Sequence, residues 1–287
     1  MKNHRRDFLG KSALGIFGLF SISPQLYANN NLGFFPKKNP LQDGNELNPL
    51  YPTEDPMVLR EVVGAAHTRF EKVKKLVTAK PELAKASWDW GFGDVESALG
   101  AASHMGRKDI AEFLIEYGAR PDIFTFAMLG KLNAVRSMIE DMPGIQKIRG
   151  PHGFTLLFHA KMRLNRKNVE GEEKEQQEAL VAYLESLGDA NINATSLDIS
   201  EEEQKVYLGK YVFGTAEDAY FDVTINSRGM LNMARGEYFG RTLLRTDTHS
   251  FAPGGAPSVR ITFDVKDGVA QSVTVHDPVP VMKATRV

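Results

Sequence analysis

The sequence of 287 residues contains no cysteine. Disulfide bonds, thiolate zinc sites and cysteine nucleophiles are therefore all excluded. An excess of charge of either sign is missing too, because 35 Lys and Arg residues face 36 Asp and Glu residues, which gives a formal net charge of −1. Nucleic-acid binding relies on a surplus of basic side chains near the phosphates, so we expect no nucleic-acid partner.

The signatures of several common enzyme classes are also missing. The chain has no Gly-x-Ser-x-Gly elbow, no complete Walker-type Gly-x-x-x-x-Gly-Lys-Ser/Thr loop and no His-Glu-x-x-His pair. These absences favour a protein without catalytic activity. The sequence predicts no cofactor and no metal ion.

An apolar run extends from Ala13 to Ile22, and it is shorter than the ~20 apolar residues that span a membrane. The pair Arg5-Arg6 precedes it and Leu26-Tyr27-Ala28 follows it. This arrangement resembles a twin-arginine export signal, with an uncleaved anchor as the alternative. The resemblance implies cleavage after residue 28 and a periplasmic or otherwise exported protein, without a stable membrane span once the signal is removed.

The chain beyond the signal changes its pattern twice. Residues 29–55 are rich in Asn and Pro and predict a linker. From Pro56 onward, apolar residues recur at helical spacing in four successive pairs of stripes. The first stripes contain Leu59, Val62, Val63 and Ala66, then Val73, Leu76 and Val77, then Ala98, Leu99, Ala101 and Ala102. Recurring short helix pairs predict stacked repeats, because one pair alone cannot bury its apolar face.

The segment from Ser97 to Ala119 resembles the ankyrin repeat. Its Leu99, the small pair Ala102-Ser103 and the closing Gly118-Ala119 stand where that repeat has a leucine, a small pair and a Gly-Ala end. The resemblance implies an ankyrin-repeat domain of about four repeats over residues 56–192. It also implies a protein that binds another protein rather than a substrate.

The period changes again after an acidic connector at residues 193–203. Apolar residues now alternate in short runs, separated by turns rich in Gly, Asp and Pro. This pattern predicts a small all-β domain at residues 204–287, either an antiparallel barrel or a sandwich. The segment from Tyr207 to Tyr211 resembles the small β domain appended to some serine β-lactamase-like hydrolases. The predicted fold class is thus α+β multidomain, an α-helical ankyrin-repeat solenoid followed by this β domain.

Two groups of residues in the helical part are candidates for partner binding. The first is a loop with Trp88, Asp89, Trp90 and Phe92, which holds both tryptophans of the chain. Tryptophan dominates the binding energy of many interfaces, so this loop predicts a binding finger. The alternative is that the loop folds back as a cap over the first helix pair.

The second group follows from superposing the helix pairs. His67 and His104 then take the same position, and Met128 continues the row. Partner contact or packing is favoured over a shared metal ion, because neighbouring helices lie ~10 Å apart and the pattern places no carboxylate nearby. Arg107 and His152 complete the predicted partner-binding set.

The predicted strands contain a third group of candidates. They are Arg235, Arg241, Arg245, His249 and Arg260. Such side chains at a barrel mouth would hold an anionic ligand. The sequence therefore leads to a periplasmic, non-catalytic adaptor for a partner protein. The alternative is ligand binding or catalysis in the β domain, with the helical array as its scaffold.

Overall fold

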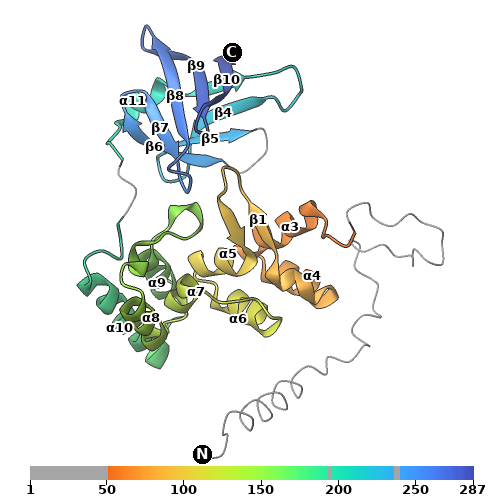
Figure 1. Ribbon diagram of the computed structural model, residues 1–287, viewed down its shortest axis with the longest axis vertical. Helices are drawn as coiled ribbons and strands as arrows, with labels where there is room; N and C mark the ends of the chain where they lie inside the picture. Colours follow the sequence, from red (N-terminus) through yellow and green to blue (C-terminus); the bar gives the residue numbers. More distant parts are fainter. Residues whose placement is uncertain (1–50, 193–195, 236–239) are drawn as a thin grey trace, which may run out of the picture.

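The computed structural model describes residues 51–192, 196–235 and 240–287. The predicted signal at residues 1–28 and most of the predicted linker lie outside these residues. Helices occupy the first part of the described chain and strands the last part (Figure 1). None of the helices in these three ranges is long and apolar enough to cross a membrane.

Side-chain caps define where several helices of the first part begin. The helices are α3 (Pro56–Ala66), α4 (Phe70–Ala79), α5 (Ala98–His104), α6 (Lys108–Glu116), α7 (Ile123–Met128), α8 (Leu132–Asp141), α9 (Leu156–Leu164) and α10 (Gly171–Ser186). Asp55, Ser97, Asp122 and Thr155 accept hydrogen bonds from the first-turn amides of α3, α5, α7 and α9. Each cap satisfies a backbone donor that has no partner within its helix.

The predicted ankyrin-repeat solenoid is wrong. The first helices of successive pairs begin at uneven intervals, at Pro56, Ala98, Ile123 and Leu156, and helix length varies from 6 residues in α7 to 16 in α10. The buried apolar side chains form two clusters, one from Val62 to Met128 and the other from Ile123 to Ala190. A solenoid instead repeats one unit and buries one continuous core. Caps and glycine ends occur at helix termini in many folds, so the motif at residues 97–119 reflected local helix chemistry.

A small hairpin lies between the first two helix pairs. The 3-10 helix Pro81–Lys85 leads into strand β1 (Ser87–Asp89), which pairs antiparallel with β2 (Val95–Ser97). Trp88 and Trp90 pack against the core of the first helix pairs. The ring of Trp90 lies 3.8 Å from the position that a Cβ of Gly64 on α3 would take. The hairpin is therefore folded onto α3. This is where the alternative interpretation, a cap over the first helix pair, places it.

The predicted β domain is an eight-stranded closed barrel, so the barrel prediction is confirmed. Its strands are β3 (Gly209–Val212), β4 (Tyr220–Ile225), β5 (Leu231–Arg235), β6 (Arg241–Asp247), β7 (Ser250–Pro253), β8 (Arg260–Lys266), β9 (Val269–His276) and β10 (Pro280–Arg286). Each strand pairs antiparallel with the next, and β10 pairs with β3 to close the barrel. Helix α11 (Glu201–Lys205) precedes it; it begins in the connector predicted at residues 193–203 and ends two residues beyond it.

Aromatic side chains fill the barrel core. The ring of Tyr207 lies 5.0 Å from that of Phe251 and 4.9 Å from that of Phe263, and the hydroxyl of Tyr211 donates a hydrogen bond to the carbonyl of Tyr207. An eight-stranded barrel has an interior just wide enough for side chains to fill. The interior of the barrel is thus filled by side chains around Tyr207 and Phe251.

The barrel meets the helical part at the turn between β7 and β8. A Cβ on Gly255 in this turn would lie 2.9 Å from the carboxylate of Asp94 and 3.1 Å from the Cα of His152. Only a residue without a side chain allows this approach. Contact between the two parts therefore falls beside the hairpin turn and the segment around His152.

We expect a methyl group at Gly106 to lower the free energy of unfolding by about 3 kcal/mol. Gly106 has φ +63°, and a Cβ there would lie 2.6 Å from the carbonyl oxygen of Met162 on α9. A left-handed backbone costs a non-glycine residue ~1–2 kcal/mol, and forced overpacking adds ~1–3 kcal/mol. Gly188→Ala is the matched control, since Gly188 has φ +73° and no described atom within 4 Å of its Cβ position. Equal losses for the two alanine variants in urea unfolding would contradict the close approach.

Candidate metal centre

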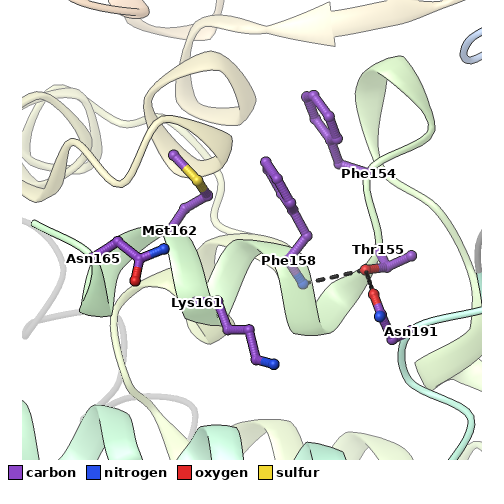
Figure 2. Close-up of a pocket in the computed structure, with 7 residues that line it drawn as sticks. All are labelled: Phe154, Thr155, Phe158, Lys161, Met162, Asn165 and Asn191. Atoms are coloured by element: carbon purple, nitrogen blue, oxygen red, sulfur yellow. Dashed lines mark hydrogen bonds between the residues drawn. The ribbon is translucent and has the colours of Figure 1, made fainter. Parts of the chain in front are cut away.

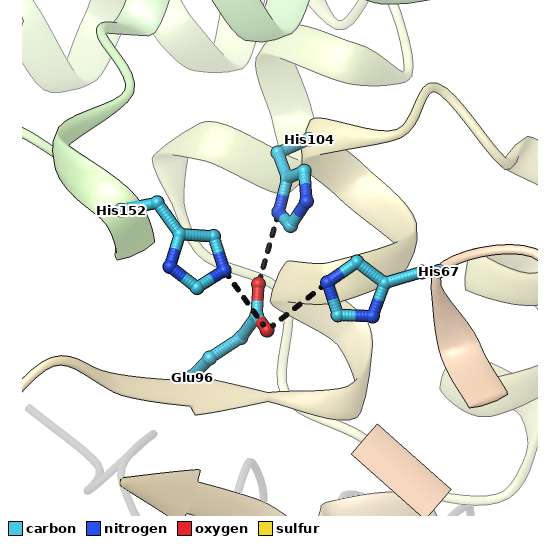
Figure 3. Close-up of side chains that lie close together, drawn as sticks. All are labelled: His67, Glu96, His104 and His152. Atoms are coloured by element: carbon cyan, nitrogen blue, oxygen red, sulfur yellow. Dashed lines mark ion pairs between the residues drawn. The ribbon is translucent and has the colours of Figure 1, made fainter. Parts of the chain in front are cut away.

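Four side chains converge between the hairpin and α5 (Figure 3). We refer to them as the His₃Glu cluster, and they are His67, Glu96, His104 and His152. Their potential ligand atoms all lie within 4.8 Å of one another. They come from four segments, namely the residue after α3, strand β2, the last residue of α5 and the 3-10 turn Pro151–Gly153. Imidazole nitrogens with a carboxylate oxygen form a ligand set for a divalent transition metal.

The separations around Glu96 suit one central ion. Its Oε2 atom lies 3.4 Å from Nε2 of His67 and 3.5 Å from Nε2 of His152. Ligand atoms that each lie ~2.0–2.1 Å from a tetrahedral zinc ion are about 3.3–3.4 Å apart. Its Oε1 atom lies 2.9 Å from Nδ1 of His104. The more distant pairs, at up to 4.8 Å, would have to move closer for all four atoms to bind one ion.

Two atoms of the cluster are buried without an aligned hydrogen bond. They are Oε1 of Glu96 and Nδ1 of His104, and neither has a hydrogen-bond partner among the described residues, although they lie 2.9 Å apart. The side chain of Glu96 is 0% exposed and that of His104 is 5% exposed. A buried polar atom without a partner costs ~1–3 kcal/mol. A metal ion bound to both atoms would satisfy both.

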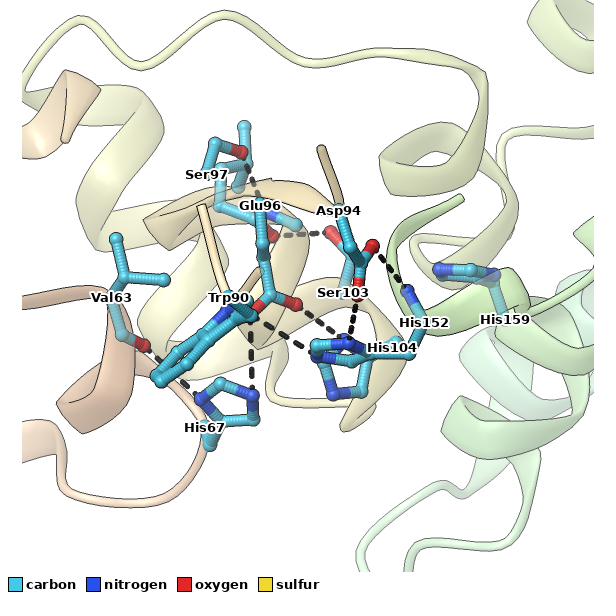
Figure 4. A network of polar contacts seen from close by, with 12 residues as sticks. Val63, His67, Trp90, Asp94, Glu96, Ser97, Ser103, His104, His152 and His159 are labelled. Carbon is cyan, nitrogen blue, oxygen red and sulfur yellow. Dashed lines mark hydrogen bonds and ion pairs between the residues drawn. The ribbon is translucent and has the colours of Figure 1, made fainter. Parts of the chain in front are cut away.

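Outer contacts orient the side chains of the cluster (Figure 4). Nδ1 of His67 lies 3.1 Å from the carbonyl oxygen of Val63, which leaves its Nε2 atom facing Glu96. The indole N–H of Trp90 donates a 2.8 Å hydrogen bond to Oε2 of Glu96. Metal-binding histidines commonly donate their second ring N–H to a carbonyl or carboxylate, which orients the ring.

Asp94 supplies the corresponding contact for His152. Its two carboxylate oxygens accept from the backbone N–H of His152 at 2.9 Å and face ring atom Nδ1 at 2.8 Å. His152 has a left-handed backbone with φ 60°, which is rare for a residue with a side chain. Such strain persists where surrounding contacts over-determine it, and it is concentrated at functional sites. Asp94 thus holds both the backbone and the ring of His152.

The charges of the cluster depend on each other. Burial alone would raise the pKa of the Glu96 carboxyl, but the contacts with His104 and His152 hold it well below its usual range. Burial lowers the pKa of His152, but hydrogen bonds with Asp94 and Glu96 outweigh it and raise this pKa to about 9. Burial lowers the pKa of His67. Without an ion, a protonated His152 therefore balances an ionised Glu96.

A cavity of about 350 Å³ lies beside α9 (Figure 2). Phe154, Thr155, Phe158, Lys161, Met162, Asn165 and Asn191 line it. The ring of Phe154 lies 5.2 Å from that of His104 and stacks on Phe158 at 4.2 Å. Phe154 therefore contacts both the cavity and the cluster, and it gives His104 an apolar neighbour.

The residues predicted for partner binding fall into three environments. His67, His104 and His152 meet in the cluster, and Trp90 contacts it. Met128 is buried in the helical core, and Trp88 is half-buried against it. Asp89 and Phe92 are exposed at the hairpin turn, and Arg107 binds Asp109 through two hydrogen bonds.

The residues predicted for an anionic ligand do not converge. Arg235 pairs with Asp218 and Arg245 pairs with Glu203 at the barrel surface. His249 contacts the hydroxyl of Tyr207, and Arg260 contacts His276. Arg241 points towards the helical part and pairs with Asp94. Each of the five thus has its own partner within the chain.

Glu96 and Asp94 were missed by the sequence prediction. The sequence predicts the row of His67 and His104, but it places no carboxylate near that row and so favours partner contact or packing over a shared metal ion. The signal was the triplet Asp94-Val95-Glu96 after a glycine-containing turn. Alternate residues of a strand share a face, and here both acidic side chains are buried while Val95 is 57% exposed. Two buried acidic residues at alternate positions, directly before and within a short strand, predict a site with cationic partners.

No family model, no curated protein and no solved structure matches the chain. The geometry of the His₃Glu cluster is therefore the main guide to function.

We expect the metal-free protein to lose stability as the pH rises from about 6.5 to about 9. The folded pKa of His152 is about 9, above the ~6.5 of a free imidazole, so the folded state binds more protons between these values. The stabilisation is complete below pH ~6.5 and is lost as the pH passes the folded pKa. The full effect is ~3 kcal/mol.

Urea unfolding in a chelating buffer would measure this slope. His152→Gln should remove it, because glutamine does not titrate. His276→Gln, on barrel strand β9, is the control and should retain it. The same slope in wild type and in His152→Gln would contradict the assigned role of His152.

Proposed function

We propose that this protein binds one divalent transition-metal ion through His67, Glu96, His104 and His152. The observation that carries the proposal is the convergence of four oriented ligand atoms, two of which are buried without aligned hydrogen-bond partners. Three imidazoles with one carboxylate favour zinc, iron, nickel or copper over magnesium or calcium, which prefer oxygen ligands. The proposal departs from the sequence prediction, which included no metal ion.

The ion would serve a structural role in this chain. Structural zinc sites use four protein ligands, whereas catalytic sites leave one position to water or substrate. Here the side chains of the four candidate ligands are 24%, 0%, 5% and 13% exposed, in the order His67, Glu96, His104 and His152. They join α3, the hairpin, α5 and the 151–153 turn. An ion that links such segments contributes its binding energy directly to folding.

The predicted adaptor role is compatible with this proposal and stays a prediction, as does export. Asp89 and Phe92 are exposed at the hairpin turn, and the hairpin carries Glu96. An ion bound to Glu96 would fix the hairpin and hence the position of these two side chains. A partner protein would then meet a pre-organised turn, which lowers the entropic cost of binding.

Metal titration of the full-length chain without an affinity tag tests the proposal. We expect one zinc ion per chain by competition with a coloured chelator. Cobalt should give the visible absorption bands of a four-coordinate site. Glu96→Gln and His104→Ala should each weaken zinc binding by more than ~100-fold, since the loss of an outer-shell contact alone costs 10–100-fold. Nickel, copper and iron(II) titrations would rank the metals.

The matched control is His249→Gln, because His249 contacts the barrel residue Tyr207 rather than the cluster. Its zinc affinity should equal that of the wild type. Glu96→Gln keeps the shape of the side chain and an oxygen for the Trp90 hydrogen bond, so circular dichroism should show an intact fold. Failure of wild type to bind any of these metals, or equal affinity in all variants, would refute the proposal.

A further inference from the structure

A buried ion pair joins the β-barrel to the helical part beside the His₃Glu cluster. Arg241 at the start of β6 directs its guanidinium away from the barrel, where Nη1 donates to Oδ2 of Asp94 and Nη2 donates to the carbonyl of Gly91 at 3.3 Å. Both side chains are nearly fully buried, with 8% of Arg241 and 4% of Asp94 exposed. Removal of one partner from a buried pair leaves an uncompensated charge, so this contact is sensitive to the position of Asp94.

Asp94 links this contact to the cluster. The same Oδ2 atom that accepts from Arg241 lies 2.8 Å from Nδ1 of His152, and the other ring nitrogen of His152 lies 3.5 Å from Glu96. Asp94 thus lies between Arg241 and His152, whose Nη1 and Nδ1 atoms are themselves 3.1 Å apart, and His152 in turn faces Glu96. A displacement of His152 would shift the carboxylate on which the barrel residue rests.

A second contact reinforces the first. Gly255 in the β7–β8 turn lies against the carboxylate of Asp94 and the Cα of His152. A Cβ on Gly255 would lie 2.9 Å from the carboxylate and 3.1 Å from that Cα. The barrel therefore contacts Asp94 through the charged side chain of Arg241. Its backbone at Gly255 also contacts both Asp94 and His152. These contacts are made when Asp94 holds Nδ1 of His152. In that arrangement Nε2 of His152 points towards Glu96 and the proposed ion.

We propose that metal binding and docking of the β-barrel are coupled through Asp94, so that an ion in the His₃Glu cluster fixes the barrel against the helical part. This inference rests on the proposed metal site. An ion holds His152, His152 and Asp94 hold each other, and Arg241 with Gly255 binds that pair. Coupling free energies are reciprocal, so a docked barrel must raise the affinity for the ion by the same factor.

The absence of cysteine makes the first arm of the test direct. Glu112→Cys on α6 and Asp264→Cys on β8 place two spin labels on exposed positions of the helical part and the barrel. We expect one narrow distance distribution with zinc, and a broader or longer one after chelation. Arg241→Met should broaden the distribution with zinc bound. Identical distributions in the zinc-bound and zinc-free wild type would overturn the coupling.

The second arm measures the reverse effect through a neutral substitution. Gly255→Ala pushes a methyl group against the Asp94 carboxylate, and we expect a roughly 10-fold loss of zinc affinity, within the 5–150-fold range of allosteric couplings. Arg241→Met is less suited to this readout, because the loss of its charge also removes repulsion of the ion. Gly268→Ala in the β8–β9 turn is the matched control, with φ +76° against +85° at Gly255 and no described atom within 4 Å.

The two proposals fail in different ways. A wild-type chain that binds no metal refutes the metal site, and the coupling fails with it. A wild-type chain that binds one ion but shows unchanged label distances, or equal zinc affinity for Gly255→Ala and Gly268→Ala, refutes the coupling alone.

Discussion

A buried carboxylate organises the helical part of this protein. Glu96 is fully buried on β2, and an ionised carboxylate in such a place is tolerated only with cationic or hydrogen-bonding partners. The partners are the indole N–H of Trp90 and three imidazoles from separate segments. Compensation of this one charge accounts for the hairpin folded onto α3 and for the two histidines beside it, one directly after α3 and one at the end of α5. The left-handed backbone of His152 is held by the same requirement, because it places that ring next to Glu96.

The same electrostatic requirement extends to the barrel. Asp94 lies two residues before Glu96 on the hairpin and binds His152 on one side and Arg241 on the other. Two buried acidic side chains on one hairpin would be unstable without partners. Arg241 on β6 compensates Asp94, and the three histidines compensate Glu96. The barrel has its own aromatic core. It is held against the helical part by the Arg241–Asp94 ion pair and by the close approach of Gly255.

The sequence predicted local structure better than the way the elements pack. The 3.6-residue stripes located the helices, and their Val62, Leu76 and Leu99 are buried. Periodicity identifies the buried face of a helix and leaves open which helix covers it, so uneven pairs with two cores were mistaken for one solenoid. Alternation likewise located the strands, but the choice between barrel and sandwich depends on the pairing of β10 with β3, which joins residues far apart in the chain. The histidine row was visible in the sequence, whereas Glu96 enters it only because the hairpin folds inward.

The exposure of His67 has a consequence for kinetics. Three of the candidate ligands are at most 13% exposed and are backed by α5, the hairpin or the barrel, whereas His67 is 24% exposed and follows the last turn of α3. Helix termini fray on fast timescales, while packed cores open rarely. An ion held here would exchange with solvent through brief opening of that last turn, with His67 as the first ligand to leave and the last to bind. Its residence time would then depend on the local stability of α3, while its equilibrium affinity would depend on all four ligands together.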